Sequence, residues 1–226
     1  MVFDPASLPD LTGRVYIITG GNAGLGYETT KALAAKGATV YLGARSEPKA
    51  TAAIEKLRET LQNPTAPIHY LHFDHMDLAT VVTGAQTFLS KETALHGLIL
   101  NAGIMCTPYE MSKDGYEAHW QTNYLSHFLL SSLLMPILTA TAQNCEPGVV
   151  RFVEMTSGAH AMAKSPGIRF DKNDLPDNEP FDRYAQSKLA NILHVREVNK
   201  LVGPKEGEPV KGEIWTAAVH PGLVDT

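Results

Sequence analysis

The sequence predicts an α/β fold: a doubly wound parallel sheet of about six strands, with helices on both faces. Short β-branched runs alternate with longer helical patterns, which is typical of βαβ units. A glycine-rich turn joins the first such run to the first helical pattern. The length of 226 residues suits one large domain over residues 1–226.

The first half of the chain is expected to alternate strands and helices. "RVYIITG" (14–20) is the first strand, because β-branched and aromatic residues dominate it. The helix over 27–37 is closed by Gly37, and the helix after the second strand begins near Pro48, a residue favoured at helix starts. The other elements expected here are the strand 38–45, a helix end at Leu61, the strand 68–74 and the helix 77–91.

The second half continues the alternation around two irregular segments. The proline-containing segment 158–182 is predicted to be a long loop, and such loops often have a function. The charged segment 203–212 is predicted to be a solvated surface turn. The regular elements expected here are strands at 97–103, 148–157 and 212–222, a long helix near 115–140 and a helix starting at Tyr184.

Composition excludes several classes of partner. The net charge is −5 and no run of lysine or arginine occurs, so neither a nucleic acid nor an anionic membrane is the expected partner. The apolar run at 123–138 is interrupted by polar residues and a proline, so no membrane span is expected. Cys106 and Cys145 suggest reduced thiols in a cytoplasmic protein, and the N-terminus does not resemble a signal peptide. No metal is expected, because no cluster has metal-ligand spacing.

The turn "TGGNAGLG" (19–26) is the first motif that indicates chemistry. It lies between a predicted strand and a predicted helix, where glycines let the backbone and the helix N-terminus approach a pyrophosphate. The spacing is GxxxGxG, and the alternative is a purely structural turn. We favour a Rossmann-like dinucleotide site, with contacts expected from Thr19, Gly20, Asn22, Gly24, Leu25 and Gly26.

The end of the second predicted strand indicates which dinucleotide binds. An acidic residue there would bind the 2′-hydroxyl of NAD, but "LGARS" places Ala44 and Arg45 at this point. A guanidinium would bind the 2′-phosphate of NADP by paired, charge-assisted hydrogen bonds. We therefore expect NADP rather than NAD; the alternative is that Arg45 is only a solvated arginine.

The segment "YAQSK" (184–188) places Tyr184 and Lys188 one helical turn apart. Positions i and i+4 share a helix face, so the ammonium would favour the phenolate form of Tyr184. Such a tyrosine can exchange a proton with a carbonyl or an alcohol. Taken alone, the pair is better explained as an ordinary exposed pair.

Five motifs in order resemble the short-chain dehydrogenase/reductase family: the glycine turn, "NAG" at 101–103, a serine after the fifth strand, YxxxK and a late "PG". The chain is similar to the retinol-dehydrogenase-like and carbonyl-reductase-like members. The resemblance implies hydride transfer between a nicotinamide and a carbonyl or secondary alcohol. It also implies a homodimer formed through the long helices, and a small-molecule substrate that is lipophilic or a product of secondary metabolism.

The resemblance also implies roles for individual residues. Tyr184 would be the general acid/base, and Lys188 would favour the tyrosinate and hold the nicotinamide ribose. Ser157 would orient the substrate oxygen, and Asn123 would hold a water that links Lys188 to solvent. Cofactor contacts would come from Asn101, Asp74, Pro221, Gly222, Val224 and Thr226.

Structural explanations compete with these roles. Ser157 could be a strand-end hydrogen bonder, Asn101 and Asn123 could brace turns, and His127 and His160 are expected to pack or brace loops. His75 stands where the family often has an aliphatic residue.

The sequence stops at Thr226, before the lid helices and seventh strand usual in the family, so we expect a C-terminally shortened domain. We expect an NADP-dependent oxidoreductase. The alternative is a truncated, non-catalytic NADP-binding or interaction protein. An epimerase or dehydratase is disfavoured by the glycine spacing and the missing substrate domain.

Overall fold

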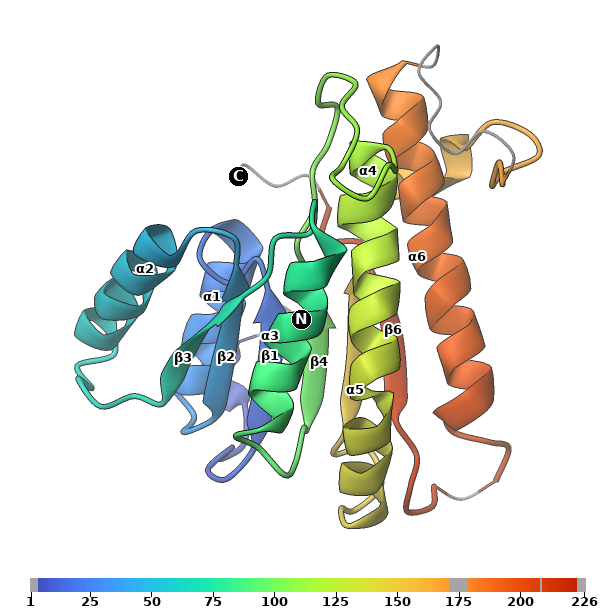
Figure 1. The fold of residues 1–226 in the computed structure, drawn as a ribbon. Coiled ribbons are helices and arrows are strands. Elements are labelled where there is room, and N and C mark those ends of the chain that lie inside the picture. Colours follow the sequence, from blue (N-terminus) through green and yellow to red (C-terminus); the bar gives the residue numbers. More distant parts are fainter. Residues whose placement is uncertain (1–3, 171–178, 208, 223–226) are drawn as a thin grey trace.

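A six-stranded parallel sheet forms the centre of the computed structural model, which describes residues 4–170, 179–207 and 209–222 (Figure 1). The strand order is β3-β2-β1-β4-β5-β6, so the chain returns past β1 to begin its second half with β4. The carboxyl ends of β1 and β4 flank this switch point, where such folds bind ligands. The strands are β1 (Val15–Thr19), β2 (Thr39–Ala44), β3 (Ile68–His72), β4 (Gly97–Leu100), β5 (Arg151–Met155) and β6 (Trp215–Val219).

Helices cover both faces of the sheet, as the sequence predicts (Figure 1). Helices α1 (Gly24–Ala34) and α2 (Glu47–Thr60) pack on one face. The other face carries α3 (Leu78–Leu89), α5 (Ser126–Gln143) and α6 (Pro180–Val202). The short elements are η1 (Pro5–Ser7), α4 (Ala118–Trp120), the π-helix η2 (Gln121–Leu125) and the 3-10 helix η3 (Gly158–Met162).

The two faces are filled by alternate residues of each strand. In β1, Ile17 belongs to the core cluster that includes residues of α3, α5 and α6, while Tyr16 and Ile18 belong to the cluster that includes residues of α1 and α2. Alternation follows from the pleat, which directs successive side chains to opposite faces. Because helices cover both faces, all five residues of β1 are buried, and the strand is continuously apolar except for Thr19.

The starts of α6 and α1 differ from the predictions. Helix α6 begins at Pro180, four residues before Tyr184, because proline suits the first turn of a helix. The segment 158–182 is therefore not one long loop: η3 occupies its start and α6 its end. Helix α1 begins at Gly24 rather than at residue 27, so the last glycines of the turn belong to the helix.

The long helical segment is continuous through α4, η2 and α5. By length and composition, Ala118–Gln143 could cross a membrane. In this fold it is a core helix instead, because Leu130, Leu134 and Leu138 are fully buried against the sheet. Pro136 lies within α5 on the exposed side and does not end the helix.

Candidate active site

The glycine turn is fastened to the end of β4. Thr19 Oγ1 accepts hydrogen bonds from the backbone N–H groups of Asn101 (2.9 Å) and Ala102 (3.0 Å), and Asn101 Nδ2 donates to the Thr19 carbonyl (2.9 Å). A Cβ added to Gly26 would lie 2.2 Å from the carbonyl oxygen of Gly20, so only glycine fits there. Hydrogen bonds therefore connect the turn after β1 directly to the turn after β4.

The start of α1 suits an anion. Its N-cap residue is Ala23, whose side chain offers no acceptor, so the first N–H groups of the helix are not capped by that side chain. Such groups and the helix dipole favour a phosphate. Gly20 and Gly24 have φ angles of +67° and +51°, which shape the turn before the helix. These features fit a dinucleotide pyrophosphate.

Two predicted cofactor residues lie at the neighbouring strand ends. Arg45 directly follows β2 and is exposed, whereas Asp74 follows β3 and is half-buried. Asp74 also braces its own turn, because its Oδ1 accepts from Met76 N at 3.0 Å. Strands β2 and β3 are paired in parallel, so both side chains are attached at the same edge of the sheet. Asn22 and Leu25, in the glycine turn, are half-buried.

Tyr184 and Lys188 are both buried on α6, with relative exposures of 9% and 5%. Lys188 Nζ lies 5.7 Å from the centroid of the Tyr184 ring and donates to the Met155 carbonyl at 2.9 Å. Burial lowers the pKa of Lys188 to about 8, although the nearby Glu154 opposes this shift. The lysine is thus a buried ammonium beside the phenol at neutral pH.

Ser157 lies at the start of η3, and η3 packs on α6 beside Tyr184. Ala159 of η3 packs against Tyr184 and Ala185. Ser157 is the N-cap of η3, and its Oγ accepts from Ala159 N at 3.2 Å. His160 Nδ1 lies 2.7 Å from the Ser157 carbonyl, which braces the same turn. Ser157 therefore has a structural role in addition to any contact with a substrate.

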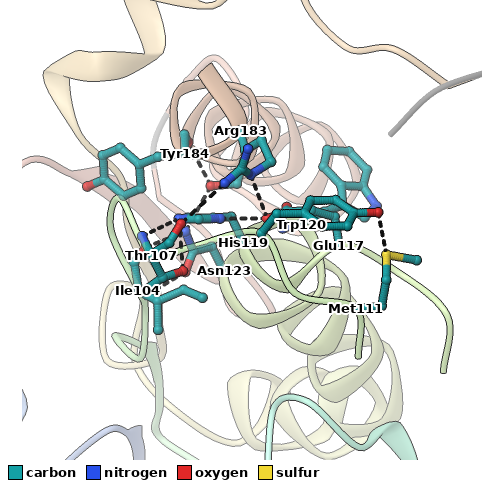
Figure 2. Close-up of polar contacts among 11 residues, drawn as sticks. Ile104, Thr107, Met111, Glu117, His119, Trp120, Asn123, Arg183 and Tyr184 are labelled. Carbon is teal, nitrogen blue, oxygen red and sulfur yellow. Dashed lines mark hydrogen bonds and ion pairs between the residues drawn. The ribbon is translucent and has the colours of Figure 1, made fainter. Parts of the chain in front are cut away.

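Asn123 lies in the π-helix and holds the loop that follows β4 (Figure 2). Its Oδ1 accepts from Ile104 N at 2.8 Å, and its Nδ2 donates to the Ile104 carbonyl at 3.0 Å and to Ser187 Oγ at 2.9 Å. A Cβ on Gly103 would lie 3.2 Å from Asn123 Oδ1 and 3.5 Å from Lys188 Nζ. The backbone of "NAG" thus lies against both side chains. Single π-helical turns within longer helices often occur at functional sites.

His127 connects the glycine turn to the π-helix. Its Nε2 lies 3.0 Å from Thr19 Oγ1, and its Nδ1 lies 3.1 Å from the Asn123 carbonyl. Thr19 Oγ1 already accepts two N–H groups, so its proton is donated to Nε2, and Nδ1–H donates to Asn123. Burial lowers the pKa of His127 well below its usual value, which keeps this neutral tautomer. The neighbouring His75 ring, whose Nδ1 meets Ser126 Oγ at 2.8 Å, packs edge-on against His127.

Glu154 is a fully buried carboxylate that sequence reasoning missed. Its Oε1 accepts from Asn191 Nδ2 at 2.5 Å, and His194 Nδ1 lies 2.8 Å from its Oε2. Asn191 Nδ2 also donates to the Asn123 carbonyl at 2.8 Å, which links β5, α6 and the π-helix. Burial raises the pKa of Glu154. The available signal was a glutamate inside an apolar strand, "FVEM".

The remaining predicted residues follow β6. Pro221 and Gly222 are exposed, and Val224 and Thr226 lie outside the described residues. A Cβ on Gly158 would lie 3.4 Å from His220 Nε2, so this segment adjoins the start of η3. Within the described residues, no group of three or more His, Cys, Asp or Glu could hold a metal ion.

A family model described as short chain dehydrogenase matches residues 14–165. A short-chain dehydrogenase/reductase from Aspergillus calidoustus is 52% identical over 98% of this chain and 71% of its own length. An uncharacterised oxidoreductase from Schizosaccharomyces pombe is 41% identical over 97% of this chain, and human retinol dehydrogenase 12 is 38% identical over 95%. The chain spans 62% of the length of each of these last two relatives.

Solved structures share the fold. An uncharacterised protein from Mycobacterium paratuberculosis is 32% identical, with a TM-score of 0.71 over 88% of this chain and 66% of its own. A 7α-hydroxysteroid dehydrogenase, solved with NADH and 7-oxo glycochenodeoxycholic acid, has a TM-score of 0.70 over 99% of this chain and 76% of its own. At 24% identity, the second likeness concerns the fold alone.

Proposed function

Since the chain belongs to the short-chain dehydrogenase/reductase family of oxidoreductases, we propose that it is an NADP-dependent enzyme acting on a carbonyl or secondary alcohol. The observation that carries this proposal is the buried pair on α6, in which Lys188 Nζ lies 5.7 Å from the Tyr184 ring centroid. A buried ammonium beside a phenol supports proton transfer by that phenol.

The residues present fit a nicotinamide dinucleotide. The glycine turn leaves no room for a Cβ at Gly26, and the start of α1 is not capped by a side chain. The other candidate cofactor residues lie at the ends of β1, β4 and β3; they are Thr19, Asn22, Leu25, Asn101 and Asp74. When bound, the cofactor supplies or accepts the hydride at its nicotinamide ring.

This chain's own residues would then handle the proton and the substrate oxygen. Tyr184 gives its hydroxyl proton to the carbonyl oxygen during reduction and takes it back during oxidation. Ser157 donates a second hydrogen bond to the same oxygen, where negative charge grows in the transition state. Lys188 places positive charge beside the phenol, and Asn123 orders the loop against which Lys188 lies.

The preference for NADP over NAD rests on Arg45. It is exposed directly after β2, where an acidic residue would otherwise bind a ribose 2′-hydroxyl. A guanidinium at this edge would bind the 2′-phosphate instead. Titration of the chain with NADPH and with NADH measures this preference directly.

The substrate is proposed to be a lipophilic small molecule, such as a product of secondary metabolism. Large apolar side chains are exposed on the segments around Tyr184: Met105 is 64% exposed, Met162 63% and Phe181 36%. One relative is named a retinol dehydrogenase, a name that indicates a lipophilic substrate for that protein.

Association and location are also proposed. Phe128 on α5 and Leu193 on α6 are 45% and 39% exposed, and these neighbouring helices would form a homodimer interface. The two cysteines are both free, which fits a cytoplasmic protein. Light scattering measures the mass in solution.

A screen tests the proposed function. The 226-residue chain is mixed with NADPH and a series of aldehydes and ketones, and with NADP and the matching alcohols, while absorbance at the nicotinamide band is followed. Turnover of at least one carbonyl, lost in Tyr184→Phe, is the expected result. NADPH binding without turnover of any compound would contradict catalysis and favour the non-catalytic alternative.

A further inference from the structure

The loop after β4 is held at two points by side chains rather than by backbone pairing. At Ile104, both the N–H and the carbonyl are bound by Asn123. At Thr107, the N–H donates to His119 Nε2 at 3.2 Å, and the carbonyl accepts from Arg183 Nη2 at 3.2 Å. Between these points lie Met105 and Cys106, both exposed.

One carboxylate joins the two groups that hold Thr107. Glu117 Oε1 lies 2.6 Å from His119 Nδ1 and 3.2 Å from Arg183 Nε. Its Oε2 accepts from Trp120 N at 2.9 Å, which caps α4. Figure 2 shows Arg183 directed at Glu117 and Thr107, while the Tyr184 ring lies on the other side of the same helical turn.

The cluster is buried and balanced in charge. Relative exposures are 1% for Glu117, 0% for His119 and 3% for Arg183. Because His119 Nε2 accepts from Thr107, its proton is on Nδ1 and is donated to Glu117, so the ring is neutral. One carboxylate then faces one guanidinium. Removing two charges from water costs about as much free energy as their attraction returns, so a buried ion pair adds little to stability. A role in fixing the position of the loop is the better explanation.

We propose that Glu117, His119 and Arg183 are positioning residues that fasten Thr107 to the first turn of α6 and so set where the exposed tip Met105–Cys106 stands relative to Tyr184. We call Glu117, His119 and Arg183 the clamp. Arg183 directly precedes Tyr184, so the clamp ties the exposed tip, on the proposed substrate side of the site, to the proposed catalytic residue. This inference rests on the proposed function. It predicts that the clamp governs which carbonyls are accepted, and leaves cofactor binding unaffected.

Two substitutions loosen the clamp in different ways. Glu117→Gln keeps the shape but removes the charge that Arg183 faces and replaces one acceptor by a donor. Arg183→Lys keeps the positive charge but loses the planar fork that reaches both Glu117 and Thr107. Lys113→Gln is the control, because it removes an exposed ion pair to Asp77 from the same segment of chain.

The first measurement is hydrogen exchange of the peptide 101–111, which does not depend on activity. We expect about tenfold faster exchange in both clamp variants, because the bonds at Thr107 open more often, and no change in Lys113→Gln. Unchanged exchange in both clamp variants would overturn the inference.

The second measurement is steady-state kinetics with a small and a bulky ketone, together with NADPH titration. We expect KM for the bulky ketone to rise about tenfold or more in the clamp variants, with kcat and the small ketone little changed. NADPH affinity should be unchanged. Equal losses for both ketones, or weakened NADPH binding, would indicate general damage and overturn the inference. If the wild type reduces no carbonyl, the proposed function fails, and exchange alone decides whether the clamp exists.

Discussion

Thr19 Oγ1 lies 3.0 Å from His127 Nε2, and this contact joins the proposed cofactor turn to the π-helix that carries Asn123. The same hydroxyl accepts the N–H groups of Asn101 and Ala102. One fully buried hydroxyl thus serves three neighbours. These hydrogen bonds of Thr19 hold the end of β1, the end of β4 and the start of α5 in fixed positions relative to one another.

Thr19→Val should destabilise the fold without changing its shape. The substitution leaves two backbone donors and one histidine nitrogen unpaired in the interior, which costs on the order of 3 kcal/mol or more. Urea unfolding measures the loss. Thr83→Val is the control, because it removes an exposed hydroxyl that bonds only within its own helix. Equal stabilities for the two variants would contradict the role given to Thr19.

Tyr184→Phe should abolish turnover while the cofactor still binds. The ring remains packed on Ala159 and Ala185, but no hydroxyl proton is available, so we expect a loss of about 10²-fold or more in kcat. NADPH oxidation and NADPH fluorescence titration measure the two properties separately. The exposed Tyr116→Phe should behave like the wild type. Residual activity close to that of the wild type would refute the catalytic role.

Lys188 should make stability depend on pH. Burial lowers its pKa from 10.5 to about 8, so between these values the unfolded chain holds more protons than the folded one. The free energy of unfolding of the wild type should therefore rise, relative to Lys188→Met, by roughly 3 kcal/mol from pH 7 to above pH 10. Urea unfolding of both proteins across this range measures the difference, and a constant difference would contradict a buried ammonium.

Arg45→Gln should weaken NADPH binding and leave NADH binding nearly unchanged. Loss of a charge-assisted contact with the 2′-phosphate should raise the Kd for NADPH by about ten- to a hundredfold. Fluorescence titration with both dinucleotides measures the ratio. Arg196→Gln, an exposed arginine on α6, is the control. If both dinucleotides lose affinity equally, Arg45 does not select between them.

Gly26→Ala should disrupt the proposed pyrophosphate site. The added Cβ would lie 2.2 Å from the Gly20 carbonyl oxygen and 2.6 Å from Asn101 Nδ2, so the turn must move. We expect NADPH affinity to fall at least about tenfold, because the backbone cradle depends on that turn. Titration measures it, with circular dichroism to establish that the variant is folded. Unchanged affinity in a folded variant would place the dinucleotide elsewhere.

Much of the fold could be predicted because its signals are local. Strands β1, β2 and β4 are largely apolar runs between turns, and β1 is apolar at both odd and even positions because helices cover both sheet faces. Helix starts were less predictable: α6 begins at Pro180 rather than at Tyr184, since proline at a first turn and a loop proline look alike in sequence. The six-stranded parallel sheet and the helices on both of its faces agree with the prediction.

By itself the sequence determined the alternation of strands and helices, the glycine turn and the spacing of Tyr184 and Lys188 on one helix, because these depend on neighbours a few residues apart. Only the tertiary structure decided that Thr19 meets His127, that Glu154 reaches Asn191, and that Glu117 meets Arg183. Those partners are far apart in the chain, and a buried polar residue reveals its partner only when packing brings the two together.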